Sequence, residues 1–180
     1  MKLLACPKCH QQLHLENKTL KCENNHCYDI SKRGYINLLL NPDKATNNPG
    51  DSKESLVARK AYLNKGYYDL ILNQVITCID EFKHQDDLSI LDLGCGEGYY
   101  TQGLKKHFEN SDIYGLDISK IAIDMATRYR KDVTWLVGNS KNIPILDHSL
   151  DFICALFTVV NQDELKRALK EDGYIVHVTA

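Results

Sequence analysis

The sequence predicts an α/β protein in which a parallel sheet of five strands follows a small cysteine-rich module. From residue 88 onward, short β-branched or apolar runs alternate with helical windows of about ten residues. Such alternation is typical of a parallel sheet with helices on both faces. Four of the seven cysteines fall within the first thirty residues. The chain is therefore expected to hold a small module and one larger domain.

The expected elements follow the apolar periodicity along the chain. Apolar residues recur at helical spacing in residues 56–66 and 70–82, which predicts two helices, with Ser52 or Ser55 as the cap of the first. The expected strands are residues 88–93, 112–117, 133–138, 150–157 and 173–179. Three more helices are expected at residues 97–109, 119–130 and 161–170. The expected division is a cysteine-rich module at 1–38, a linker loop at 39–55 and an α/β domain at 56–180.

The composition restricts the kind of protein and its location. Hydrophobic residues make up 43% of the chain and charged residues 26%, as in globular proteins. No apolar run reaches the length of about eighteen residues that a membrane span needs, and the apolar start of the chain is too short for a secretory signal. We therefore expect no membrane contact and a cytoplasmic location, where clustered cysteines bind metal rather than form disulfides.

Cysteines near the amino terminus have the spacing of a metal site. Cys6 and Cys9 form a C-x-x-C turn, and Cys22 follows with two candidate fourth ligands, His26 and Cys27. Such ligands can surround one Zn²⁺ tetrahedrally, with Zn–S bonds of about 2.3 Å. Four protein ligands leave no open position, so the zinc would be structural and would stabilise a module that has few apolar residues. The alternative is a redox-active C-x-x-C pair, which leaves the downstream cluster unexplained.

A glycine-rich loop follows the first expected strand of the sheet. Residues 90–101 read Ile-Leu-Asp-Leu-Gly-Cys-Gly-Glu-Gly-Tyr-Tyr-Thr, so that a strand ends near Asp92 and a helix begins a few residues later. Gly94, Gly96 and Gly98 allow the backbone to approach a ligand where any Cβ would clash. The loop lies at the carboxyl ends of the strands, where open α/β sheets bind small molecules.

A second acid and the pattern of the loop indicate which ligand binds. Asp117 ends the next strand, where an acid accepts hydrogen bonds from a ribose diol. A dinucleotide is the main alternative, but its fingerprint has the spacing G-x-G-x-x-G. The pattern D-x-G-x-G-x-G resembles the class I S-adenosylmethionine methyltransferases, which have a Rossmann-like sheet. This resemblance implies that Asp92 and the loop hold the methionine end of the donor, and that Asn139 and Ser140 contact its adenine.

Two classes of methyl acceptor are disfavoured by the sequence. Methylation of a pyrimidine carbon needs a cysteine nucleophile on a mobile loop. Cys154 is expected within a strand instead, and Cys95 within the glycine loop. Exocyclic-amine methyltransferases typically carry an Asn/Asp-Pro-Pro-aromatic motif after the fourth strand, where this chain has Leu156-Phe157-Thr158-Val159.

The cysteine turn, the segments after it and the glycine loop together resemble one family. The residues that carry the resemblance are Cys6-Pro-Lys-Cys9, Cys22 with His26, Gly34-Tyr35-Ile36-Asn37-Leu38-Leu39, Pro49-Gly50-Asp51-Ser52, and Asp92 through Thr101. They closely resemble the bacterial 23S rRNA (guanine-N1)-methyltransferases of the RlmA family, over nearly the whole chain. The resemblance implies methyl transfer from S-adenosyl-L-methionine to N1 of a guanine in a 23S rRNA hairpin.

The resemblance also implies roles for individual residues. His26 matches the fourth zinc ligand of the family, which favours it over Cys27. The donor is expected to contact Tyr68, Gly96, Glu97 and Gly98. The 23S rRNA is expected to bind the ribbon through its basic residues, Lys2, Lys8, Lys18, Lys21, Lys32 and Arg33. Removal of the guanine N1 proton needs a base, and Asp51, Glu97 and His177 are candidates of which none is assigned.

The end of the chain and the alternatives lead to further expectations. Family members extend past Ala180, so the resemblance implies further strands and a cofactor-contacting histidine beyond it. An unpaired edge at residues 174–178 predicts self-association, for example as a homodimer. A chain of this length is expected to bind zinc, but to bind the donor weakly and to lack methylation.

Two other functions stay open: a zinc-ribbon RNA-binding protein with a non-catalytic methyltransferase-like domain, and a small-molecule methyltransferase.

Overall fold

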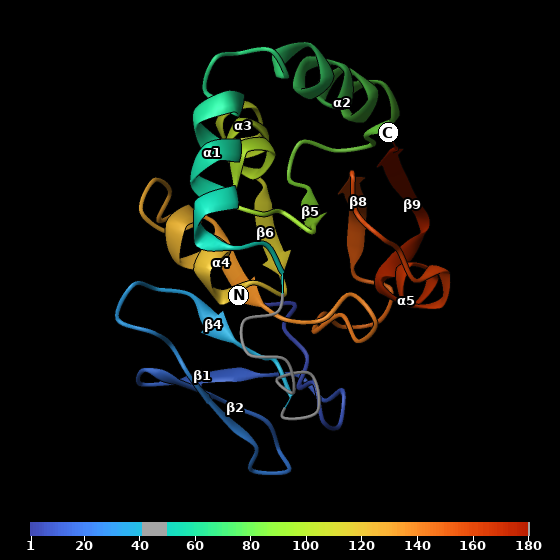
Figure 1. The fold of residues 1–180 in the computed structure, drawn as a ribbon. Coiled ribbons are helices and arrows are strands. Elements are labelled where there is room, and N and C mark those ends of the chain that lie inside the picture. Colours follow the sequence, from blue (N-terminus) through green and yellow to red (C-terminus); the bar gives the residue numbers. More distant parts are fainter. Residues whose placement is uncertain (41–49, 180) are drawn as a thin grey trace.

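The computed structural model describes residues 1–40 and 50–179, and its centre is a parallel sheet of six strands (Figure 1). The strand order is β4-β7-β6-β5-β8-β9, and every neighbouring pair is parallel. The carboxyl ends of these strands therefore share one edge of the sheet. The strands are β4 (Ile36–Asn37), β5 (Ser89–Leu93), β6 (Asp112–Asp117), β7 (Thr134–Val137), β8 (Leu150–Leu156) and β9 (Leu169–Val178).

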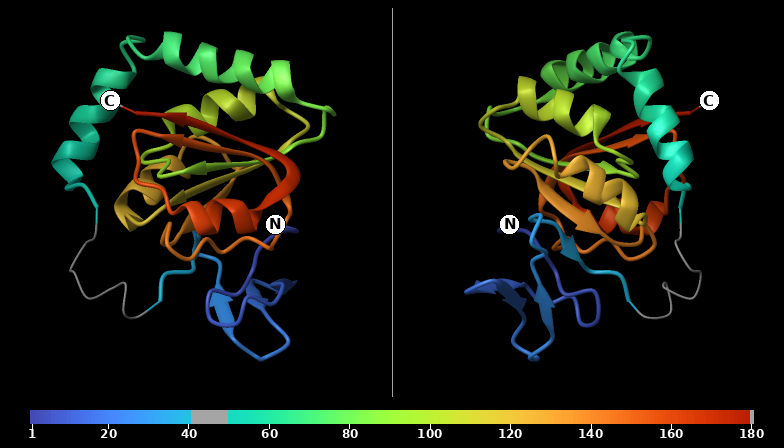
Figure 2. Two further views of the ribbon diagram at one scale, coloured as in Figure 1. Left: turned by 90° about the vertical axis from the view of Figure 1, so that its right-hand side faces the viewer. Right: turned by 60° about the vertical axis from the view of Figure 1, so that its left-hand side comes forward.

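Both faces of the sheet are covered, and each face has its own apolar cluster (Figure 2). Side chains alternate between faces along a strand, so Ile90 and Phe152 belong to one cluster and Leu91 and Ile153 to the other. The first cluster is covered by α2 (Asp69–Phe82), α3 (Tyr99–His107) and α4 (Lys120–Ala126). The second is covered by α5 (Gln162–Ala168) and by the cysteine-rich module.

The cysteine-rich module packs on the sheet and shares its core. Its three antiparallel strands are β1 (His14–Glu16), β2 (Thr19–Lys21) and β3 (Cys27–Asp29). Leu4, Leu13 and Leu20 are buried in the same cluster as Leu91 of β5. The first strand-like segment also joins the large domain directly, because Leu4 forms a β-bridge with Ile145. The module therefore gains apolar burial from the sheet that its own few apolar residues do not provide.

The five predicted strands are confirmed, but the sheet has a sixth. Ile36 and Asn37 pair in parallel with Leu136 and Val137 of β7, although the predicted boundary at residue 38 placed them in the module. Two residues are too few for an apolar alternation to be visible in the sequence. The last strand also begins earlier than predicted, because Leu169 already pairs with Leu150; a register shift then separates this pair from the Phe152–Tyr174 pair.

The first predicted helix begins inside the predicted linker. Helix α1 (Lys53–Leu63) starts three residues before residue 56, and the Ser52 side chain caps it by accepting a hydrogen bond from the Ser55 N–H at 3.2 Å. Helix α1 contacts α4. Residues 41–49 of the predicted linker, and Ala180 at the predicted chain end, lie outside the described residues. Among the helices of the described ranges, none is both long and apolar enough to cross a membrane.

Candidate functional site

Four side chains of the cysteine-rich module converge on one point. The ligand atoms of Cys6, Cys9, Cys22 and His26 all lie within 4.8 Å of one another. The His26 Nδ1 is 3.4 Å from the Cys6 Sγ and 3.5 Å from the Cys22 Sγ, and the Cys9 and Cys22 sulfurs are 3.7 Å apart. Ligands placed tetrahedrally around Zn²⁺ at about 2.3 Å are separated by about 3.7 Å. The donor set and its spacing therefore fit a zinc ion with four protein ligands.

Two tight turns present these ligands. The Cys6 carbonyl accepts a hydrogen bond from the His10 N–H at 2.8 Å, and the Cys22 carbonyl accepts one from the Asn25 N–H at 2.9 Å. His10 and Asn25 both have a left-handed backbone, with φ of 59° and 61°. Cys27 lies outside the cluster, is exposed, and donates its thiol to the Asn25 carbonyl. The geometry thus groups His26, and not Cys27, with the three cysteines.

The first of these turns is hydrogen-bonded to a loop of the larger domain. The Asn142 side-chain amide donates to the Pro7 carbonyl at 2.9 Å, and the Ala5 N–H donates to the Pro144 carbonyl at 3.0 Å. Asn142 belongs to the loop after β7 that also contains Asn139 and Ser140. The backbone N–H of Asn142 donates to the Asn139 carbonyl at 3.1 Å. The metal-site turn is therefore connected to the loop in which an adenine contact was predicted.

The glycine loop after β5 contains three residues with a left-handed backbone, and their surroundings explain in two ways why they are glycine. Gly94, Gly96 and Gly98 have φ of 73°, 55° and 88°. A Cβ on Gly94 would lie 2.4 Å from the Thr158 hydroxyl, and one on Gly98 would lie 2.6 Å from the Trp135 ring. Within residues 1–40 and 50–179, no atom lies within 4 Å of a Cβ on Gly96. The outer glycines thus make room for the protein itself, whereas Gly96 faces open space.

Asp117 supports the glycine loop from the end of β6. One of its carboxylate oxygens accepts a hydrogen bond from the Gly96 N–H at 2.8 Å, and the other accepts one from the Ser119 N–H at 2.8 Å. Burial raises the pKa of Asp117, and these two backbone donors oppose that rise. Each oxygen keeps a further lone pair, so the carboxylate can still accept from a ligand hydroxyl.

Asp92 is buried at the end of β5, beside the start of α3. It is 1% exposed and accepts a hydrogen bond from the Thr101 hydroxyl at 2.5 Å, so it holds the start of α3 against the end of β5. Burial raises its pKa to about 7, although the Thr101 hydrogen bond opposes the rise. Asp92 lines neither of the two cavities at the strand ends. Its contact with the methionine end of a donor stays a prediction.

Two cavities lie at the carboxyl ends of the strands and share Gly94. The larger, of about 360 Å³, is lined by Tyr68, Gly94, Gly96 and Glu97 among others. The smaller, of about 120 Å³, is lined by the predicted ribose and adenine residues Asp117, Asn139 and Ser140. The structure thus brings together every predicted donor-contacting residue except Asp92 and Gly98, which line neither cavity.

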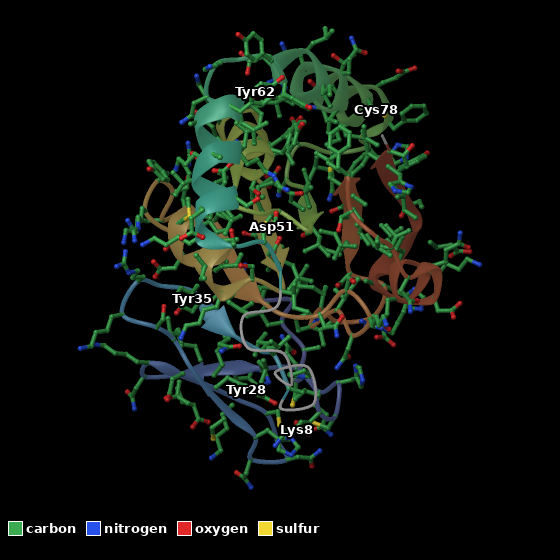
Figure 3. All side chains as sticks on the ribbon, viewed as in Figure 1. Lys8, Tyr28, Tyr35, Asp51, Tyr62 and Cys78 are labelled. Carbon is green, nitrogen blue, oxygen red and sulfur yellow. The ribbon has the colours of Figure 1, made fainter. Side chains whose placement is uncertain are left out.

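Residues from α1 and from the turn after β8 complete the larger cavity and were not predicted. Arg59 and Tyr62 of α1 line it, together with Phe157. Arg59 pairs with Asp51 at 2.7 Å, and Figure 3 shows Asp51 beside α1 and Tyr62 at the end of that helix. Burial raises the pKa of Glu97, the carboxylate that lines this cavity, while the positive charges of Lys60 and Arg59 oppose the rise. The helical spacing in α1 predicts a helix but does not indicate which site it covers.

The proposed bases differ in their relation to the cavities. Glu97 lines the larger cavity, and Asp51 is engaged by Arg59. His177 lies on β9 as an exposed side chain and lines neither cavity. Cys95 and Cys154 are buried, and burial raises the pKa of both thiols well above the usual value. Neither is suited to act as a nucleophile.

The cysteine-rich module and the larger domain each match a known protein family. Residues 4–45 match the family described as RlmA, N-terminal, whose model is a zinc ribbon, and residues 90–173 match the methyltransferase domain family. The chain is 28% identical over 181 residues to the 23S rRNA (guanine(748)-N(1))-methyltransferase of Streptomyces fradiae, covering 99% of this chain and 64% of that protein. It is 30% identical over 183 residues to a putative 23S rRNA (guanine-N(1)-)-methyltransferase of Bacillus subtilis, covering 98% and 64%. The chain therefore spans 64% of the length of these relatives.

Solved structures support the fold assignment. A putative S-adenosyl-L-methionine-dependent methyltransferase from Methanococcus maripaludis superposes with a TM-score of 0.61 at 22% identity, over 73% of this chain and 67% of that one. The complex of the Haloferax volcanii Trm112 methyltransferase activator with a putative methyltransferase gives a TM-score of 0.55 at 22% identity, over 70% and 60%. The larger domain thus has the class I methyltransferase fold.

Proposed function

Because this chain joins an RlmA-type zinc ribbon to a class I methyltransferase domain, we propose that it transfers a methyl group from S-adenosyl-L-methionine to N1 of a guanine in 23S rRNA. The observation that carries the proposal is that ribbon and domain occur in one chain that aligns from end to end with 23S rRNA guanine-N1-methyltransferases. The proposed division is a zinc ribbon at 1–38, a linker at 39–55 and a methyltransferase domain at 56–180. A ribosomal RNA substrate implies a cytoplasmic location.

The donor would occupy both cavities, with the shared Gly94 between its two ends. We assign Asp117 to the ribose hydroxyls, and Asn139 and Ser140 to the adenine, because they line the smaller cavity. Tyr68, Gly94, Gly96 and Glu97 would surround the methionine end in the larger cavity. Asp92 and Gly98 would shape the loop, through the Thr101 hydrogen bond and the space left for Trp135, and the predicted contact of Asp92 with the methionine end is kept as part of the proposal.

The chemistry places limits on what the protein must do. When bound, the donor supplies an electrophilic methyl group on a sulfonium. Transfer forms the bond from guanine N1 to the methyl carbon as the bond from that carbon to sulfur breaks, and the N1 proton leaves to water or to a base. Such an in-line displacement depends mainly on the position of the two reactants. The protein's task is therefore to orient the guanine at the larger cavity and to exclude competing water.

The ribbon would have a structural role and an RNA-binding role. Zinc held by Cys6, Cys9, Cys22 and His26 leaves no coordination position for a substrate. Lys2, Lys8, Lys18, Lys32 and Arg33 are exposed, although Arg33 pairs with Asp124 at 2.9 Å. We assign these basic residues to phosphate contacts, which position RNA without reading its sequence.

Transfer of labelled methyl from S-adenosylmethionine to unmodified 23S rRNA tests the proposal. In a protein of the relatives' full length, incorporation at a guanine N1 is the expected result, with loss of donor affinity by about tenfold or more in Asp117→Ala. Zinc and RNA binding without any donor binding would favour the non-catalytic alternative. Donor binding with transfer only to small molecules would favour a small-molecule methyltransferase.

Self-association through β9 is a separate proposal. β9 is last in the strand order, and Tyr174 and Ile175 on it are 37% and 44% exposed. Within residues 1–40 and 50–179 its outer edge pairs with no other strand, and such an edge is a template for a second chain. Light scattering that shows a monomer at high concentration would contradict a homodimer formed in this way.

A further inference from the structure

The turn after β8 carries an aromatic side chain in an unusual conformation. Phe157 has φ of 56°, which is left-handed, and a bulky residue rarely adopts this region. Its side chain is 44% exposed, so core packing does not account for the strain. The turn is held by the hydrogen bond from the Phe157 N–H to the Val178 carbonyl at 2.8 Å. Strain of this kind persists where the surrounding structure imposes it, and it occurs often at ligand sites.

Phe157 is one of three rings that form a continuous wall in the larger cavity. The Phe157 and Tyr68 ring centroids are 6.1 Å apart at 80°, and those of Tyr68 and Tyr62 are 5.9 Å apart at 68°. The three rings come from the turn after β8, the start of α2 and the end of α1, and all line the cavity. We call Tyr62, Tyr68 and Phe157 the aromatic wall.

The position of the aromatic wall indicates what it would bind. It lies in the same cavity as Gly94 and Gly96, next to the proposed methionine end of the donor. Guanine N1 is hydrogen-bonded within a base pair, so a methyl group can reach it only when the base is unpaired and turned out of its stack. Unstacked bases bind proteins by stacking on exposed Phe and Tyr rings. The exposed Phe157 ring presents such a surface beside the donor.

We propose that the aromatic wall borders the acceptor site, in which one unpaired purine of the RNA stacks on Phe157 next to the donor methyl group. This inference rests on the proposed function and assigns its substrate-contacting residues. Phe157 is the main contact because its ring is 44% exposed, lines the cavity, and is followed in the chain by Thr158, which lies against Gly94 of the glycine loop. The glycine next to this turn fits the same arrangement, because Gly94 leaves space for Thr158 and so allows the turn to approach the loop.

The test measures the binding of two RNA hairpins to the protein saturated with S-adenosylhomocysteine. One hairpin carries a single unpaired 2-aminopurine in its loop, and the other carries an abasic residue at that position. The wild type should bind the first more tightly, with a change in 2-aminopurine emission. Phe157→Leu should lower that affinity about five- to 150-fold, the range for loss of one stacked base. Its affinity for the abasic hairpin and for S-adenosylmethionine should stay unchanged.

Two control variants test whether the ring at position 157 is needed and whether loss of an exposed ring elsewhere has the same effect. Phe157→Tyr keeps a ring at the same strained position and should restore binding. Phe82→Leu removes a phenylalanine ring that is 42% exposed but lines neither cavity at the strand ends, and it should bind both hairpins as the wild type does. Thermal unfolding of each variant checks that the fold is retained.

The outcomes separate the acceptor site from the proposed function. Equal wild-type affinity for both hairpins, or an unchanged preference in Phe157→Leu, would overturn the acceptor site and leave rRNA methylation standing. Loss of donor affinity in Phe157→Leu would also overturn it, because Phe157 would then belong to the donor site. Saturable binding of guanosine 5′-monophosphate that Phe157→Leu abolishes, without hairpin binding, would support the purine site and count against an RNA substrate. Absence of both kinds of binding would overturn the site.

Discussion

Asp92→Asn should change how the stability of the protein depends on pH. Asp92 is almost fully buried at the end of β5, and burial raises its pKa from 3.8 to about 7. The Thr101 hydrogen bond favours the ionised form, but it does not compensate for burial, and the nearby charge of Asp117 adds to the rise. Asparagine has nearly the same shape, and its carbonyl can accept the same hydrogen bond from Thr101.

The sign of the effect follows from the raised pKa. The folded state holds a proton on Asp92 that the unfolded chain has already lost, so the neutral carboxyl contributes fully to stability below pH 3.8. That contribution is lost progressively as the pH rises through about 7. Each pH unit in this window lowers the free energy of unfolding by about 1.4 kcal/mol per group. Between pH 5 and the pKa near 7, the wild type therefore loses about 3 kcal/mol that Asp92→Asn does not lose.

Urea unfolding of both proteins at pH 5 and at pH 8, with zinc in excess, measures this difference. Other groups that titrate, including the metal ligands, are present in both proteins, so they cancel when the variant is compared with the wild type. Asp92→Asn should gain about 3 kcal/mol relative to the wild type on going from pH 5 to pH 8. A stability difference that is the same at both values would show that Asp92 is already ionised at pH 5. The burial argument would then be refuted.

Further predictions concern the metal, the glycine loop and the contact between them. Cys22→Ala should lose bound zinc and Cys27→Ser should retain one equivalent by elemental analysis; the reverse would exclude the proposed ligand set. Gly96→Val should abolish donor binding by calorimetry. Gly34 also has a positive φ, of 96° against 55° for Gly96, and no described atom lies within 4 Å of its Cβ position, so Gly34→Val should leave donor binding intact; equal losses would indicate backbone strain alone. Asn142→Ala should weaken donor binding up to about tenfold, because it removes the hydrogen bond between the Cys6–Cys9 turn and the loop that lines the smaller cavity. Unchanged donor affinity would show that this hydrogen bond does not couple the zinc site to the donor site.

Local patterns accounted for the elements that the sequence predicted well. The five strands and the glycine loop were found from apolar runs and glycine spacing, which depend on neighbours along the chain. The spacing of Cys6, Cys9, Cys22 and His26 is likewise local within each turn, and the structure brings the four together. Each of these features needs only a few consecutive residues to be recognised.

Long-range contacts could not be predicted in the same way. The pairing of Ile36 with Leu136 joins segments one hundred residues apart, and a strand of two residues leaves no periodic pattern. The approach of Phe157 to Tyr68 depends on a left-handed turn at a phenylalanine, which propensity disfavours. These features become visible only when the sheet has placed the ends of its strands together.

The glycine loop shows why a sequence motif does not by itself identify the ligand contacts. Asp92, Gly94, Gly96 and Gly98 belong to one pattern, yet only Gly94 and Gly96 border the cavities. Gly98 is needed because any Cβ there would collide with Trp135, a buried β7 side chain in the cluster that α4 helps to cover. Residues of such a motif are therefore constrained in two ways: some face the ligand, and others keep the loop in the shape that lets the first group do so. Substitution of Gly94 or Gly98 should reduce donor affinity and stability together through a collision with a protein side chain, whereas substitution of Gly96 should reduce affinity and lower stability only by its backbone strain.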